Sequence, residues 1–116
     1  MNILDKYNKK RLFEYDKTKE REYTNLKNLF NHFGKDKVHI VHALFINTKS
    51  RFGYAPAIVT SDYIVNAPKH LLETIKQMMN DSEVIELINS RKVGFKIYSY
   101  SGKNGMGYSV EWVLVS

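Results

Sequence analysis

A cation and two tyrosines recur at every second position near the end of the chain. Lys96, Tyr98 and Tyr100 alternate with Phe95 and Ile97, so in an extended strand the two sets of side chains point to opposite faces. The apolar face suits a protein core. The other face combines a positive charge with aromatic rings, as a surface does that binds phosphates and stacks bases. The alternative is that both tyrosines cover a second hydrophobic layer, with Lys96 in solvent.

Two polar loops carry side chains of the same kinds. The loop 47–53 contains two cations and a phenylalanine, and the loop 101–107 contains one lysine among glycines. Cations on such loops can reach phosphate oxygens, and the aromatic rings offer stacking surfaces. The candidate nucleic-acid-binding residues are therefore Lys49, Arg51, Phe52, Tyr54, Lys96, Tyr98, Tyr100 and Lys103.

Other residue spacings give no support to catalysis, a cofactor or a metal. The chain has no cysteine, which excludes thiolate chemistry and zinc–thiolate sites. A strand is expected after the glycines of 102–107, whereas a phosphate-binding P-loop opens a helix. His39 and His42 would lie on opposite faces of one strand, so they cannot share a metal ion. We expect a protein that is not an enzyme and that holds neither cofactor nor metal.

Strands must position most of these residues. The segment 38–46 is rich in β-branched and aromatic residues and predicts a long buried strand. Further strands are expected at 54–60, 63–65, 93–101 and 108–115. Pro56 predicts an edge position or a bulge in the second strand. A helix with one apolar stripe is expected from Pro68 onward, followed by a second short helix with Asp81 or Ser82 as its N-cap.

The first 37 residues are expected to form a charged extension with a net charge of +4. Apolar residues at helical spacing predict a short helix there, with Thr24 as its N-cap and Gly34 as its end. The segment 12–16 could be a short strand. The first eleven residues could be a basic arm or a loose helix.

The order strand, strand, strand, helix, strand, strand is that of an OB-fold, a five-stranded, partly open barrel with its helix between strands three and four. The chain has 116 residues, which is one domain. We therefore expect a mostly β fold with helices, in which the extension 1–37 precedes an OB-like core over 38–116. OB-folds bind oligonucleotides on strands two and three, between loops that correspond here to 47–53 and 101–107.

Positive charge is concentrated in the expected strands. The formal net charge of the chain is +6. The helical stretch 69–90 has a net charge of −2, whereas the segments 38–68 and 91–116 together have +4. A polyanion would therefore meet the sheet rather than the helices.

Several runs of residues resemble a known family. These are ALFINTKSRFG at 43–53, NAPKHL at 66–71, VGFKIYSY at 93–100 and YSVEWV at 108–113. They look like small single-stranded-DNA-binding proteins of phages and mobile elements in Gram-positive bacteria. The resemblance implies an OB-fold, binding with little sequence preference in replication or recombination, and assembly into homo-oligomers.

Two functions remain open on the sequence. The first is binding of single-stranded DNA, with RNA possible because nothing in the sequence reports on the 2′-hydroxyl. The second is a small protein-binding module, such as an inhibitor or adaptor of a host enzyme. The N-terminus has no apolar core of a signal peptide, and no apolar run is long enough to span a membrane. We therefore expect a cytoplasmic protein without a membrane partner.

Overall fold

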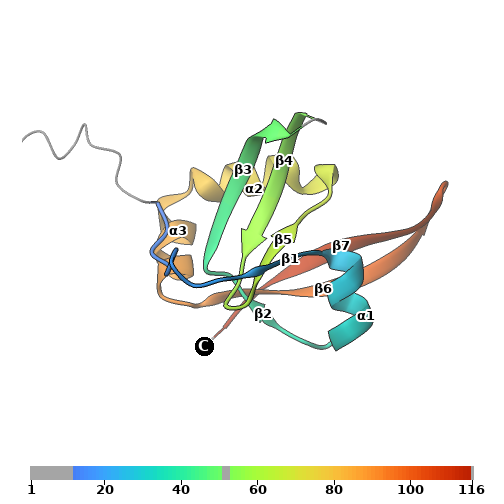
Figure 1. Ribbon diagram of the computed structural model, residues 1–116, viewed down its shortest axis with the longest axis horizontal. Coiled ribbons are helices and arrows are strands. Elements are labelled where there is room, and N and C mark those ends of the chain that lie inside the picture. The colour runs from blue at the N-terminus through green and yellow to red at the C-terminus, as the bar shows by residue number, and fades with distance from the viewer. Residues whose placement is uncertain (1–11, 51–52, 116) are drawn as a thin grey trace, which may run out of the picture.

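The computed structural model describes residues 12–50 and 53–115, which form a mixed α/β structure with seven strands and three α-helices (Figure 1). The strands are β1 (Glu22–Asn25), β2 (His39–Ile40), β3 (Ala43–Ser50), β4 (Gly53–Val59), β5 (Tyr63–Asn66), β6 (Val93–Gly102) and β7 (Gly105–Leu114). The helices are α1 (Leu26–Phe33), α2 (Leu72–Met79) and α3 (Ser82–Asn89), with the 3₁₀ turn η2 (Lys69–Leu71) directly before α2. Within these residues no helix has the length and apolar character needed to cross a membrane.

The strands form two sheets. The first has the order β1-β5-β4-β3, and the second has the order β2-β6-β7. The pair β1–β5 is parallel, and every other pair is antiparallel. Figure 1 shows the β3–β4 hairpin rising from the body with α2 behind it, while the β6–β7 hairpin extends to the side. The two hairpins therefore point in different directions.

The segment 38–46, expected as one strand, is divided between the two sheets. The backbone N–H of Val41 donates to the carbonyl of Val93 at 2.9 Å, and that of His42 donates to the carbonyl of Val59 at 2.7 Å. Consecutive residues thus bond to different sheets. The segment is divided because its two halves form backbone hydrogen bonds with strands of two different sheets.

The core lies between the two sheets and beneath the helices. Its most buried side chains include Leu44, Ile58 and Val65 from the first sheet, Phe95 and Ile97 from β6, and Ile75 and Ile88 from the helices. Phe13, Leu26 and Leu29 belong to the same cluster. Residues on both sides of position 37 therefore contribute to one core.

The expected helices are present, with small changes at their starts. α1 ends at Gly34, as expected, but its N-cap is Asn25 rather than Thr24, and the Asn25 side chain accepts from the Asn28 N–H at 2.9 Å. Asp81 caps α3 by accepting from the N–H groups of Glu83 and Val84. The helix expected after Pro68 begins with a 3₁₀ turn.

The N-terminal segment differs most from expectation. Residues 12–16 form no strand; instead, the side chain of Asn89 bonds to both Leu12 and Glu14, and Arg91 donates to the Glu14 carbonyl at 2.7 Å. The strand of this region is β1, which pairs with β5. The first eleven residues, expected as a basic arm or a loose helix, lie outside the described residues.

The expected order of elements is present in β3, β4, β5, the helices, β6 and β7, but the strands do not form a closed five-stranded barrel. β1 occupies the edge of β5, and β7 has β6 as its one ladder partner among the described residues. Pro56 lies just beyond the last β4–β5 pair, Ala57 with Asn66, and the pairing of β3 with β4 is irregular between Asn47 and Ser50.

The β6–β7 hairpin is longer than expected. The ladder continues to the pair Gly102–Gly105, so only Lys103 and Asn104 form the turn. The prediction of a seven-residue loop over 101–107 was therefore wrong. Gly105 has φ +108°, a backbone angle that residues with a side chain rarely adopt. A glycine at this position therefore permits the two-residue turn.

Candidate nucleic-acid interface

The alternation of side chains along β6 is present in the structure. Phe95 and Ile97 are fully buried, whereas Tyr98 and Tyr100 have exposed fractions of 47% and 41%. Lys96 is partly exposed on the same side as the two tyrosines. The two tyrosine ring centroids lie 6.3 Å apart with an interplanar angle of 50°. We call Lys96, Tyr98 and Tyr100 the hairpin face; both of its rings are partly exposed.

Neighbours on β7 and η2 fix the position of Tyr100. Gly107 lies opposite Tyr100 in the ladder, and a Cβ atom on Gly107 would lie 2.4 Å from the Tyr100 Cζ atom. The Tyr100 ring therefore lies directly over the glycine. The His70 ring meets it edge-on, with 6.3 Å between centroids, and His70 Nε2 lies 3.0 Å from Ser109 Oγ.

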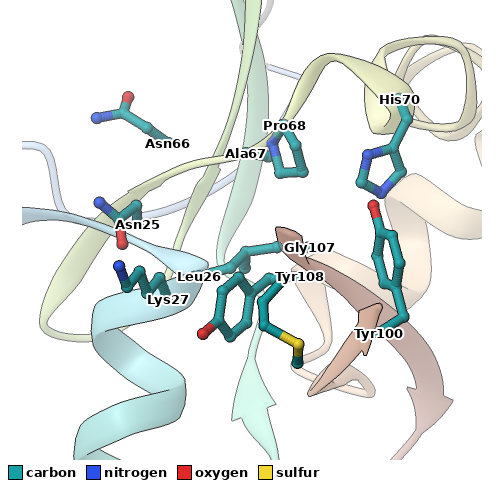
Figure 2. A pocket seen from close by; sticks show the side chains of 11 residues that line it. Asn25, Leu26, Lys27, Asn66, Ala67, Pro68, His70, Tyr100, Gly107 and Tyr108 are labelled. Atoms are coloured by element: carbon teal, nitrogen blue, oxygen red, sulfur yellow. The ribbon is translucent and has the colours of Figure 1, made fainter. Parts of the chain in front are cut away.

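A pocket of about 370 Å³ lies where the hairpin meets the first sheet, and we call it the seam pocket (Figure 2). In Figure 2, Pro68 and Ala67 lie across from Tyr108, His70 and Tyr100 stand at one end, and Asn25, Lys27 and Asn66 stand at the other. Aromatic rings, amides and one lysine around a single hollow are groups that can stack a base and bind its polar edge. The lining residues are Asn25, Leu26, Lys27, Asn66, Ala67, Pro68, His70, Tyr100, Met106, Gly107 and Tyr108.

A second aromatic and basic surface, which the sequence analysis missed, lies on the first sheet. Tyr15, Lys17, Lys19, Arg21 and Tyr23 all line one hollow of about 280 Å³, together with three apolar side chains of the sheet. These three are Phe45, Val59 and Ile64. We call the five N-terminal residues and Phe45 the sheet face.

The signal for the sheet face was present in the sequence. The residues at 15, 17, 19, 21 and 23 are Tyr, Lys, Lys, Arg and Tyr, and those between them are acidic or threonine. This period of two was missed because the segment has no apolar strand pattern, and only its end belongs to β1. The alternate residues nevertheless share one surface.

Direct contacts hold the cations of the sheet face in place. Lys17 Nζ lies 5.8 Å and Arg21 Cζ 5.4 Å from the centre of the Tyr15 ring. Arg21 also donates to the carbonyls of Thr60 and Asp16, at 2.8 and 2.6 Å. Lys19 forms a 3.0 Å ion pair with Asp62.

A half-buried histidine, His42, lies in the positive potential beside the sheet face. Burial first, and then the charges of Arg91, Arg21 and Lys19, lower the pKa of His42 to about 4, against a smaller opposing effect of Asp62. This side of the molecule therefore disfavours an additional positive charge.

The structure does not bring all eight candidate residues together. Lys96, Tyr98 and Tyr100 form the hairpin face, and Lys103 stands at the turn of the same hairpin. Tyr54 lies on the other hairpin, where Lys76 of α2 lies 5.5 Å from its ring centre. Lys49 is in β3, but its side chain is not described, and Arg51 and Phe52 lie outside the described residues.

Within residues 12–50 and 53–115, no group of three or more histidine, aspartate or glutamate side chains is placed to hold a metal ion. No protein-family model, curated protein or solved structure matches the chain.

Proposed function

We propose that the protein binds single-stranded DNA with little sequence preference. The observation that carries this proposal is the hairpin face, where two exposed tyrosine rings stand side by side next to Lys96. Stacking on tyrosine tolerates any base, and a lysine beside the rings can bind the backbone phosphate. The seam pocket adds a place for a base at the inner end of the same hairpin.

We also propose that the fold is related to an OB-fold whose barrel is open. β3, β4 and β5 form an antiparallel meander, β2 connects it to β6, and β6 pairs with β7, as the strands of an OB-fold would. β1 takes the edge of β5 that would otherwise face β7. On this reading the seam pocket lies at the opening.

The biological setting of the proposal comes from the resemblance found in the sequence. It comprises replication or recombination of a phage or mobile element, a cytoplasmic location and assembly into homo-oligomers. Several copies on one strand would add affinity, because a single domain of this kind covers only ~4–16 nucleotides. RNA is a second possible ligand.

The proposal is tested by titrating the protein with fluorescent oligo-dT at several salt concentrations. We expect binding that weakens with salt, and Tyr98→Ala should cost ~1–3 kcal/mol of affinity, the contribution of one base stacked on an aromatic ring. Tyr98→Phe, which keeps the ring, is the matched control and should bind like the wild type. Lys96→Ala should reduce the slope of log K against log salt by ~0.7.

Tyr98→Ala and Lys96→Ala should both show the circular dichroism of the wild type, since neither side chain is buried in the core. The proposal is wrong if Tyr98→Ala and Lys96→Ala bind as tightly as the wild type at every salt concentration. If the wild type binds no oligonucleotide even at low salt, the alternative of a protein-binding module is favoured.

A further inference from the structure

The sheet face is a separate surface from the hairpin face, and it combines the same two kinds of side chain. Three cations lie between two tyrosines, and Tyr23 has an exposed fraction of 69%. Phe45 and Ile64 provide an apolar floor from the sheet. A row of cations flanked by aromatic rings matches the alternating charge and base planes of a single strand.

The contacts within the sheet face leave Lys17 and Lys19 available to a phosphate. The ion pair between Lys19 and Asp62 is largely exposed, and exposed pairs contribute little free energy, so a phosphate can replace the carboxylate. Lys17 lies beside the Tyr15 ring and is itself exposed. Arg21 bonds to backbone carbonyls and thereby holds the segment against the sheet.

The sheet face continues into the seam pocket. Asn25 follows Tyr23 by two residues in β1, and Asn66 follows Ile64 by two residues in β5, so each lies on the same side of the sheet as its predecessor. Both asparagines line the seam pocket, whose other end is formed by Tyr100 of the hairpin face. A continuous line of binding groups therefore connects the two faces.

We propose that the sheet face is a second binding surface for the phosphodiester backbone and bases of the same single strand, which passes from the hairpin face through the seam pocket to the sheet face. This inference rests on the proposed function, because it extends the path of that ligand. It implies that the segment 15–23 contributes to affinity and not only to the fold.

The test uses the full chain and a fluorescent oligo-dT of about 20 nucleotides, longer than the site of one OB-like domain. We expect Lys17→Ala to reduce the salt slope by ~0.7, as for one phosphate contact. Tyr23→Ala should weaken binding at least fivefold, whereas Tyr23→Phe should not. Lys92→Ala, which removes one exposed positive charge outside the hairpin face, the seam pocket and the sheet face, is the charge-matched control and should leave the salt slope unchanged.

Photo-crosslinking provides an independent measurement. An oligo-dT with 4-thiothymidine at several positions should form cross-links to the peptide that contains Tyr15 or Tyr23, identified by mass spectrometry. The inference is overturned if Lys17→Ala and Tyr23→Ala bind like the wild type and no cross-link falls within 15–23. If Tyr98→Ala then still weakens binding, the proposed function stands without it; if the wild type binds no oligo-dT, the proposed function itself fails.

Discussion

The position of the Tyr100 ring depends on Gly107, the residue opposite it in the ladder, which has no side chain. A methyl group on Gly107 would overlap the Tyr100 ring, and the exposed ring can avoid it only by turning away from β7. We therefore expect Gly107→Ala to weaken oligo-dT binding by ~1–3 kcal/mol, the contribution of one stacked base. Fluorescence anisotropy measures the affinity, and a thermal melt should show only a small change in stability.

A double variant distinguishes loss of the ring from a general disturbance of the hairpin. If Gly107→Ala acts through Tyr100, then adding it to Tyr100→Ala should cause no further loss of affinity. Additive losses would show that Gly107→Ala affects binding by another route.

His39 makes the stability of the fold sensitive to acid. Its ring stacks on Phe95 with 5.1 Å between ring centroids, and its Nε2 atom is buried with no hydrogen-bond partner among the described residues. Burial, with a smaller contribution from Lys37, lowers the pKa of His39 to about 4 from an ordinary value of 6.5. The unfolded chain thus binds this proton more readily, so the free energy of unfolding should fall as the pH drops from about 6.5 to 4, by up to ~3 kcal/mol for this group.

Urea denaturation across this pH range measures the effect. His39→Phe keeps the stacking surface and removes the proton site, so its stability should depend less on pH than that of the wild type. The remaining dependence should include His42, whose pKa is also lowered to about 4. Parallel pH curves for wild type and His39→Phe would contradict the prediction.

At the scale of elements, the Asn89 side chain at the end of α3 binds the segment 12–14. The Asn89 side chain accepts from the Glu14 N–H at 2.8 Å and donates to the Leu12 carbonyl at 3.2 Å. Asn89→Ala should therefore destabilise the protein by ~1–3 kcal/mol, the contribution of two hydrogen bonds. Hydrogen exchange should show faster exchange at 12–16. Asn80→Ala is the control, because it removes one exposed side-chain hydrogen bond at the C-terminal end of α2. Unchanged exchange at 12–16 in Asn89→Ala would contradict the prediction.

Val110, Trp112 and Leu114 alternate along β7 and therefore share one face of the strand, but they differ in burial. Val110 is buried and Trp112 is half-buried against Phe95, at 6.1 Å between ring centroids, but Leu114 has an exposed fraction of 74%. Trp112→Ala should therefore destabilise by ~2–3 kcal/mol, less than for a fully buried tryptophan. Leu114→Ala should change stability by less than ~0.5 kcal/mol. Denaturant unfolding compares the two, and strong quenching of Trp112 fluorescence by oligo-dT would instead indicate a stacking role.

Elements that depend on neighbouring residues could be predicted from the sequence, and those that depend on distant partners could not. The end of α1 at Gly34 and the Asp81 cap follow from local chemistry, and so does the alternation of β6. β1 has no apolar pattern, and its strand conformation comes from the distant edge of β5. The division of the segment 38–46 after Val41 has the same cause, since it depends on partners in two different sheets.

At the scale of the whole molecule, the candidate site is spread over more of the chain than the loops of an OB-fold suggested. The hairpin face was predictable because its period of two coincides with a strand. The seam pocket was not, because it joins residues from β1, α1, η2 and both strands of the hairpin. Only the folded chain brings them to one place.

The parallel pairing of β1 with β5 also determines when the binding surface comes into existence. Glu22 pairs with Tyr63, and Asn25 pairs with Asn66, so β1 lacks this partner until β2, β3, β4 and then β5 have been synthesised. Pairs so distant along the chain form slowly. During translation residues 15–23 would therefore remain unassembled, and a nascent chain would acquire the sheet face only after β5 has emerged from the ribosome.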